Sequence, residues 1–145
     1  MNEQKVYQKI GELLWSIMVE DAKTIFCEGF IYPDTNSYSF EWINKNNNIS
    51  WFDINTIPHE IGAKIISLME ELRELEMFTE KWTHFKISLS EEGKIDFAFA
   101  YIPKDDYWPG LFMKGVSDLN KDELDIYNIP LEDWEECVKL KEQNK

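Results

Sequence analysis

Carboxylates are the residues of this sequence best suited to chemistry, and they concentrate toward its C-terminal end. Between residues 117 and 136 a single cation, Lys121, stands among eight acidic side chains. These are Asp118, Asp122, Glu123, Asp125, Glu132, Asp133, Glu135 and Glu136. Such a field repels nucleic acid and anionic membranes and speeds the encounter with a basic protein. The pattern therefore favours binding of a basic protein, although the same acidity would also keep a protein soluble.

Other groups that commonly build active sites are few and scattered. The two histidines, His59 and His84, form no HExxH motif or helical pair, and the glycines form no phosphate-binding loop. Cys27 and Cys137 are far apart and belong to no CxxC motif, which is typical of reduced thiols, and the sequence leaves their pairing open. The acids at 118–125 lack the glycine of a calcium-binding loop. We therefore expect no catalytic residue, no cofactor and no metal.

Large apolar side chains lie among these acids, and aromatic residues within a charged rim are typical of protein interfaces. They are Tyr107, Trp108, Leu111, Phe112, Ile126, Tyr127 and Trp134. An alternative is that they attach a weakly patterned tail to the core. The predicted partner-binding residues are Asp105, Asp106, Trp108, Asp118, Asp122, Glu123, Asp125, Tyr127, Glu132 and Asp133.

The composition of the whole chain is that of a folded domain. It has 145 residues, 43% of them hydrophobic, and a formal net charge of -13. This length and apolar content predict one domain over residues 1–145, with a core that needs neither disulfide nor metal. The N-terminus lacks the pattern of a signal peptide and no stretch has the length of a membrane span, so we expect a cytoplasmic protein.

Hydrophobic periodicity predicts the elements that position these residues. The expected elements are helices over 3–18, from 56 or 58 to 75, and over 131–142, and strands over 24–32, 37–42, 49–54, 82–89 and 94–101. The first three strands form a meander and the last two a hairpin. The order predicts an α+β fold, with a mostly antiparallel sheet of about five strands packed with an N-terminal, a long central and a C-terminal helix.

Short motifs within residues 3–102 form a pattern that is found in other proteins. They comprise Trp82, Phe85, Ile87 and Leu89, then Gly93-Lys94-Ile95-Asp96-Phe97 and Tyr101, and upstream Tyr7, Tyr38-Ser39-Phe40-Glu41 and Glu-Glu-Leu-Arg-Glu-Leu at 70–75. This pattern resembles that of the YezG-like immunity proteins. The resemblance ends after Pro103, where family members continue into a helix that contains basic residues. It implies an antitoxin that neutralises the C-terminal domain of a contact-dependent or polymorphic toxin, often a nuclease.

The resemblance agrees with the charge of the sequence. Nuclease toxins are generally basic because they hold phosphates, and an acidic inhibitor would find such a target quickly. We therefore expect an immunity protein, not an enzyme, that binds a basic toxin domain by electrostatic and aromatic contacts. A general acidic adaptor or nucleic-acid mimic is the main alternative, and a carboxylate-dependent enzyme is a further one.

Overall fold

The structure is a computed structural model that describes residues 2–75 and 81–143. The contacts between residues group the chain into two compact units, residues 1–99 and residues 100–145. The expectation of a single domain over 1–145 stays a prediction.

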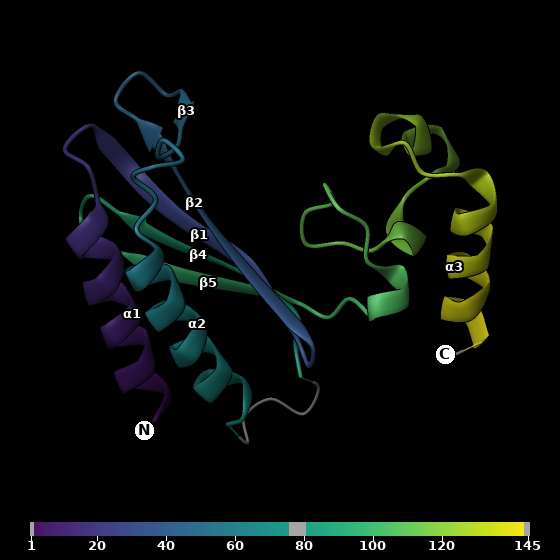
Figure 1. Cartoon of the computed structure of the whole chain (residues 1–145), viewed down its shortest axis with the longest axis horizontal. Coiled ribbons are helices and arrows are strands. Elements are labelled where there is room, and N and C mark those ends of the chain that lie inside the picture. Colours follow the sequence, from purple (N-terminus) through teal and green to yellow (C-terminus); the bar gives the residue numbers. More distant parts are fainter. Residues whose placement is uncertain (1, 76–80, 144–145) are drawn as a thin grey trace. The chain divides into compact units, whose positions relative to one another are not determined.

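The first unit contains two α-helices and a five-stranded sheet (Figure 1). Its elements are α1 (Glu3–Ile17), β1 (Ala22–Tyr32), β2 (Thr35–Asn44), β3 (Ile49–Ser50), α2 (His59–Arg73), β4 (His84–Ser90) and β5 (Ile95–Ala100). The strand order is β3-β2-β1-β4-β5, and β1 pairs antiparallel with both β2 and β4. The predicted α+β fold, with a meander and a hairpin, is confirmed.

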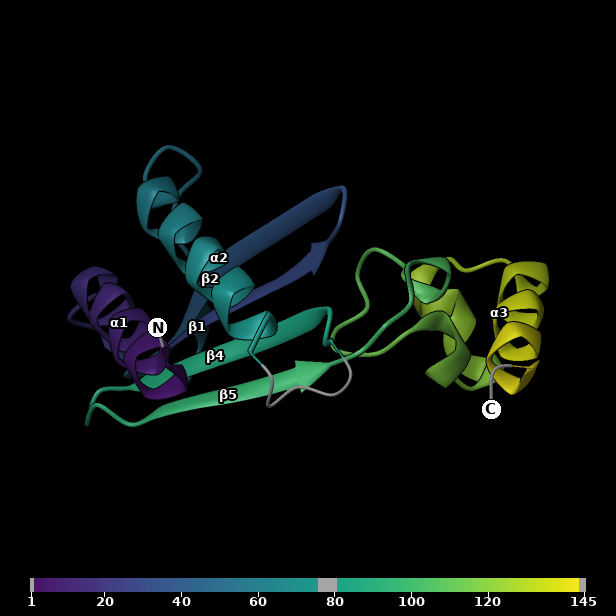
Figure 2. The same ribbon diagram turned by 90° about the horizontal axis from the view of Figure 1, so that it is seen from below.

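Both helices lie on the same face of the sheet, as Figure 2 shows. Asn2 caps α1 because its side-chain oxygen accepts a hydrogen bond of 2.9 Å from the backbone N–H of Lys5. Along α1, Val6, Ile10 and Leu14 recur at helical spacing and are fully buried. This amphipathic pattern, repeated in α2, is why the two helices pack against the sheet rather than remain in water.

The strands alternate between a buried and a more polar face, as period-two side chains do. Ile25 and Cys27 of β1 are completely buried under the helices, with Phe85 and Ile87 of β4 beside them. Glu28 lies on the opposite face of β1. The sheet therefore has one core face and one face that carries charged side chains.

The third strand is shorter than predicted, since it covers Ile49–Ser50 instead of 49–54. The chain leaves the sheet because the Phe52 ring packs against Trp42, with ring centres 4.8 Å apart. A turn follows, in which Asp53 O accepts a 2.8 Å hydrogen bond from Thr56 N. Beyond Ser50 side-chain packing thus replaces strand pairing.

The second unit is built from short helices: the 3-10 helices η1 (Lys104–Asp106), η2 (Val116–Asp118) and η3 (Lys121–Tyr127), and the α-helix α3 (Leu131–Gln143). The predicted C-terminal helix is confirmed. This unit has its own buried cluster, formed by Val116, Leu119, Leu124 and Ile129. Within the ranges that the structure describes, no helix combines the length and apolarity that crossing a membrane requires.

Candidate partner-binding site

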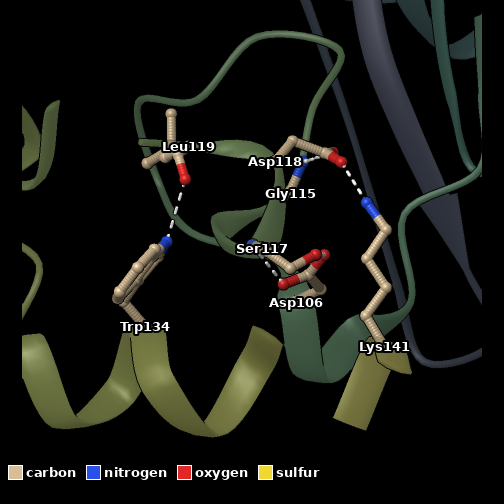
Figure 3. A network of polar contacts seen from close by, with 7 residues as sticks. All are labelled: Asp106, Gly115, Ser117, Asp118, Leu119, Trp134 and Lys141. Atoms are coloured by element: carbon tan, nitrogen blue, oxygen red, sulfur yellow. Dashed lines mark hydrogen bonds and ion pairs between the residues drawn. The ribbon is translucent and has the colours of Figure 1, made fainter. Parts of the chain in front are cut away.

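All ten predicted partner-binding residues belong to the second unit, and the structure divides them by role. Asp106, at the end of η1, holds the start of η2 (Figure 3). Its two carboxylate oxygens accept hydrogen bonds from Ser117, at 2.8 Å from the backbone N–H and 2.6 Å from the hydroxyl. Gly115 allows this approach, since a Cβ there would lie 2.1 Å from Asp106 Oδ2. Both carboxylate oxygens of Asp106 are therefore used in hydrogen bonds within the second unit.

Asp118 is also held by its neighbours. It accepts a 2.9 Å hydrogen bond from Gly115 N and forms an ion pair with Lys141 of α3 (Figure 3). Partial burial opposes ionisation of this carboxyl, but the hydrogen bonds from Lys141 and Gly115 outweigh it and hold its pKa below the usual value. Asp118 stays charged, yet Lys141 offsets its charge.

Glu123 caps the start of η3. Its side chain accepts a 2.9 Å hydrogen bond from Asn120 N, and Lys114 Nζ lies 3.9 Å from its other oxygen. Such a reciprocal cap satisfies backbone donors that a helix start leaves open. Glu123, like Asp106 and Asp118, thus supports the backbone of this unit.

The two predicted aromatic contacts support the interior of the unit as well. The Trp108 indole N–H donates a 3.0 Å hydrogen bond to the carbonyl of Tyr127. Trp134 makes the equivalent 3.0 Å bond to Leu119 O (Figure 3). Trp108, Tyr127 and Trp134 all pack against the buried cluster. These rings thus pack on the second unit's own cluster.

The remaining five predicted residues are the carboxylates that the unit leaves exposed: Asp105, Asp122, Asp125, Glu132 and Asp133. Across residues 2–75 and 81–143, no hydrogen bond or ion pair forms at these five carboxylates. Ile126, which lies among them, is 72% exposed. These five side chains are therefore accessible from solvent.

A cavity of about 470 Å³ brings part of this set together. Asp105, Asp133 and Glu136 line it together with Trp108 and Cys137. The Cys137 thiol donates to the carbonyl of Asp105 at 3.4 Å. Partial burial, followed by the negative charge of Asp106, raises the pKa of Cys137 to about 11, so the thiol is protonated at neutral pH. Asp122, Asp125 and Glu132 do not line this cavity.

Two residues of this arrangement were not among the predicted site residues. Glu136 lines the acidic cavity, and Lys141 neutralises Asp118. The helical spacing of Asp133, Glu136 and Leu140 could have pointed to Glu136, because residues three and four apart share a helix face. No sequence signal links Lys141 to Asp118, since 23 positions separate them.

The first unit contains a second carboxylate arrangement that the sequence did not reveal. Glu28 of β1 and Glu41 of β2 converge on the sheet face opposite the helices. Burial, then the hydrogen bond and charge of Glu41, raise the pKa of Glu28 to about 7, while Lys86 opposes the rise. Lys86 Nζ lies 3.9 Å from Glu28 and 4.4 Å from the centre of the Phe26 ring.

The fold and the site together define an α+β protein whose second unit carries an acidic, partly apolar cavity. Within the described residues, no group of three or more His, Cys, Asp or Glu side chains is arranged to hold a metal ion. Neither a comparison with models of known protein families nor one with curated proteins gives a match.

Proposed function

We propose that this chain is an immunity protein that binds and neutralises a cognate basic toxin domain, with a nuclease as the expected target. The observation that carries the proposal is the cavity formed by Asp105, Asp133 and Glu136 beside Trp108. Three carboxylates around an aromatic ring suit the side chain of an arginine or lysine.

The charge of the second unit supports the same role. Residues 100–145 carry eleven carboxylates and six lysines. Asp106, Asp118 and Glu123 accept hydrogen bonds from backbone N–H groups of this unit. Asp122, Asp125 and Glu132 of the same unit are exposed. A basic toxin would be drawn in by this field, and the cavity would then fix the position of one cation.

The test is a protection assay with the toxin domain encoded next to this chain. The two are co-expressed, survival is scored, and the association rate is measured from about 50 mM to about 300 mM salt. We expect protection, a stable complex and a rate that falls at least about tenfold as the salt rises. Absence of protection and of complex formation would refute the proposal.

A matched pair of variants locates the contact. The site variant carries Asp105→Asn, Asp133→Asn and Glu136→Gln, and the control carries Glu70→Gln, Glu71→Gln and Glu92→Gln. Both remove three exposed negative charges, but the control changes lie in the first unit. If the cavity binds the toxin, the site variant loses at least about 100-fold in affinity and the control less than about tenfold. Equal losses of affinity in the two variants would mean that net charge, and not the cavity, determines binding.

The alternatives predict different outcomes of these assays. A general adaptor or nucleic-acid mimic would bind unrelated basic proteins as tightly as the toxin. A carboxylate-dependent enzyme is favoured by the convergence of Glu28 and Glu41. If the chain were such an enzyme, the variants Glu28→Gln and Glu41→Gln would no longer protect. An immunity protein that acts through the second unit would still protect with either substitution.

A further inference from the structure

Most of the outer edge of β2 is unpaired. β3 pairs with β2 only at Trp42 and Ile43, where they face Ser50 and Ile49. Among the residues that the structure describes, no strand lies along the outer edge of β2 between Thr35 and Glu41. β2 is therefore an edge strand over most of its length (Figure 1).

The pairing register tells which backbone groups point outward from this edge. Ile31 N donates to Thr83 O at 2.8 Å, so odd-numbered residues of β1 bond away from β2. In an antiparallel pair, bonded and non-bonded residues alternate. Their partners on β2, including Asn36, Tyr38 and Phe40, therefore direct their N–H and C=O groups to the outer edge. Asn44 N, which donates to Asn48 O at 2.8 Å, follows the same alternation.

The edge lacks the usual protection against strand addition. Natural edge strands commonly carry lysine, proline or a bulge. Residues 35–41 contain neither lysine nor proline. The one irregularity in the β1–β2 register lies between Ala22 and Thr24, at the far end of the pair. The edge is thus regular from Thr35 to Glu41, and it is most exposed at its Thr35 end, since Phe40 is buried.

A groove runs beside this edge. It has a volume of about 580 Å³ and is lined by the β2 residues together with Trp51, Phe52, Ile57 and His59. The Tyr38 hydroxyl lies 2.6 Å from His59 Nδ1, which fixes one wall. Trp51, which lines the groove, is 68% exposed, and Ile49 and Ile54 of the same chain segment are 59% and 82% exposed. An extended segment could bury these surfaces while its backbone pairs with β2.

The negative charge around the outer edge of β2 favours a cationic segment as its occupant. From residue 34 to residue 60 the chain carries four acids and one lysine, and that lysine, Lys45, is ion-paired with Glu91. Glu41 is the one formally charged residue among those that line the groove. A second copy of this chain would bring two acidic surfaces together, whereas a cationic segment would complement them.

We infer that the outer edge of β2 is a docking site for an extended, basic segment of a partner protein, which adds to the sheet as a sixth strand. Backbone pairing with Asn36, Tyr38 and Phe40 supplies the affinity, and the apolar groove with Glu41 selects alternating apolar and basic side chains. This surface belongs to the first unit, so the inference does not rest on the immunity proposal.

The test uses the full chain and a synthetic peptide of eight residues that alternates valine and lysine, capped at both ends. Binding is followed by NMR, together with exchange of backbone amides. Saturating peptide should slow exchange at the Tyr38 and Phe40 amides at least about tenfold. A peptide with glutamate in place of lysine should bind at least about tenfold more weakly.

Two changes address the backbone pairing directly. Asn36→Pro removes one outward N–H from an exposed position and should weaken binding about threefold to tenfold, whereas Asn36→Ala should stay within about twofold. A peptide methylated at the amides that face β2 tests the same bonds without altering the protein, and it should not bind.

Three results would overturn the inference. The first is no added protection at Tyr38 and Phe40 when the lysine peptide is present in excess. The second is equal binding of the glutamate peptide. The third is a concentration-dependent dimer of the free chain that Asn36→Pro abolishes, which would identify a second copy as the occupant.

Discussion

Glu28 offers a quantitative test of the electrostatics of the sheet. Replacing it with glutamine removes an ionisable carboxyl whose pKa is raised to about 7 by burial and by the hydrogen bond and charge of Glu41. A carboxyl with a higher pKa in the folded than in the unfolded chain stabilises the fold fully below the unfolded pKa, here 4.5. That contribution is lost as the pH rises toward about 7.

The size of the effect follows from the same values. A pKa that moves from 4.5 to about 7 corresponds to about 3 kcal/mol. The Glu28 side chain keeps 24% of its surface exposed, and screening by water reduces the expected effect to about 1 to 2 kcal/mol. Glu28→Gln should therefore be more stable than the parent by that amount at about pH 8 and show no such gain at about pH 4.

The assay is urea denaturation of both proteins across this pH range. Glu92→Gln is the matched control, because Glu92 is exposed and its loss changes the net charge equally. It should change stability by less than about 0.5 kcal/mol. The reasoning fails if Glu28→Gln gains nothing at high pH, if its gain is independent of pH, or if Glu92→Gln gains as much.

Three further predictions concern other residues. Burial lowers the pKa of His84 to about 4, so its ring resonances should stay constant in an NMR titration from about pH 8 to about pH 5.5. The neutral ring contributes stability above pH 6.5 that is lost as the pH falls toward about 4. Asp106→Ala removes both bonds to Ser117 and should destabilise the second unit by about 1 to 3 kcal/mol, measured by amide exchange. Gly62→Ala places a Cβ 2.1 Å from the Tyr38 ring and should lower stability by about 1 to 3 kcal/mol in urea denaturation.

Each of these predictions has an outcome that contradicts it. A His84 midpoint above about pH 6 would show that the ring is solvated. Unchanged amide exchange in the second unit of Asp106→Ala would remove that carboxylate from its structural role. A Gly62→Ala variant as stable as the parent would mean that the Tyr38 ring can move at no cost.

Strong periodicity made the main elements of the fold predictable. The spacing of Val6, Ile10 and Leu14 indicated α1 because a helix buries one stripe of side chains. The end of β3 was not predictable from the local pattern. Residues 49–54 favour a strand, but the ring contact of Phe52 with Trp42 redirects the chain. That contact depends on tertiary structure, which strand propensity does not contain.

The candidate site was predictable in composition but not in the division of roles. The sequence shows eight acids in 117–136 and gives no reason to separate them. The separation arises because Asp118 and Glu123 meet backbone N–H groups at the starts of η2 and η3, and Asp118 also meets Lys141. The Glu28–Glu41 pair was missed because it depends on the register between β1 and β2. The sequence of either strand alone does not determine that register.

The division of carboxylates in the second unit has a consequence for how this protein would diverge. Asp106 and Glu123 accept hydrogen bonds from backbone N–H groups, whereas Asp122, Asp125 and Glu132 are exposed and, among the described residues, form no hydrogen bond or ion pair. Natural selection can therefore exchange or reverse the second set while the buried cluster stays intact. If the binding partner changes during evolution, substitutions would accumulate at those exposed positions first. The descendants would then share one scaffold and differ in binding specificity.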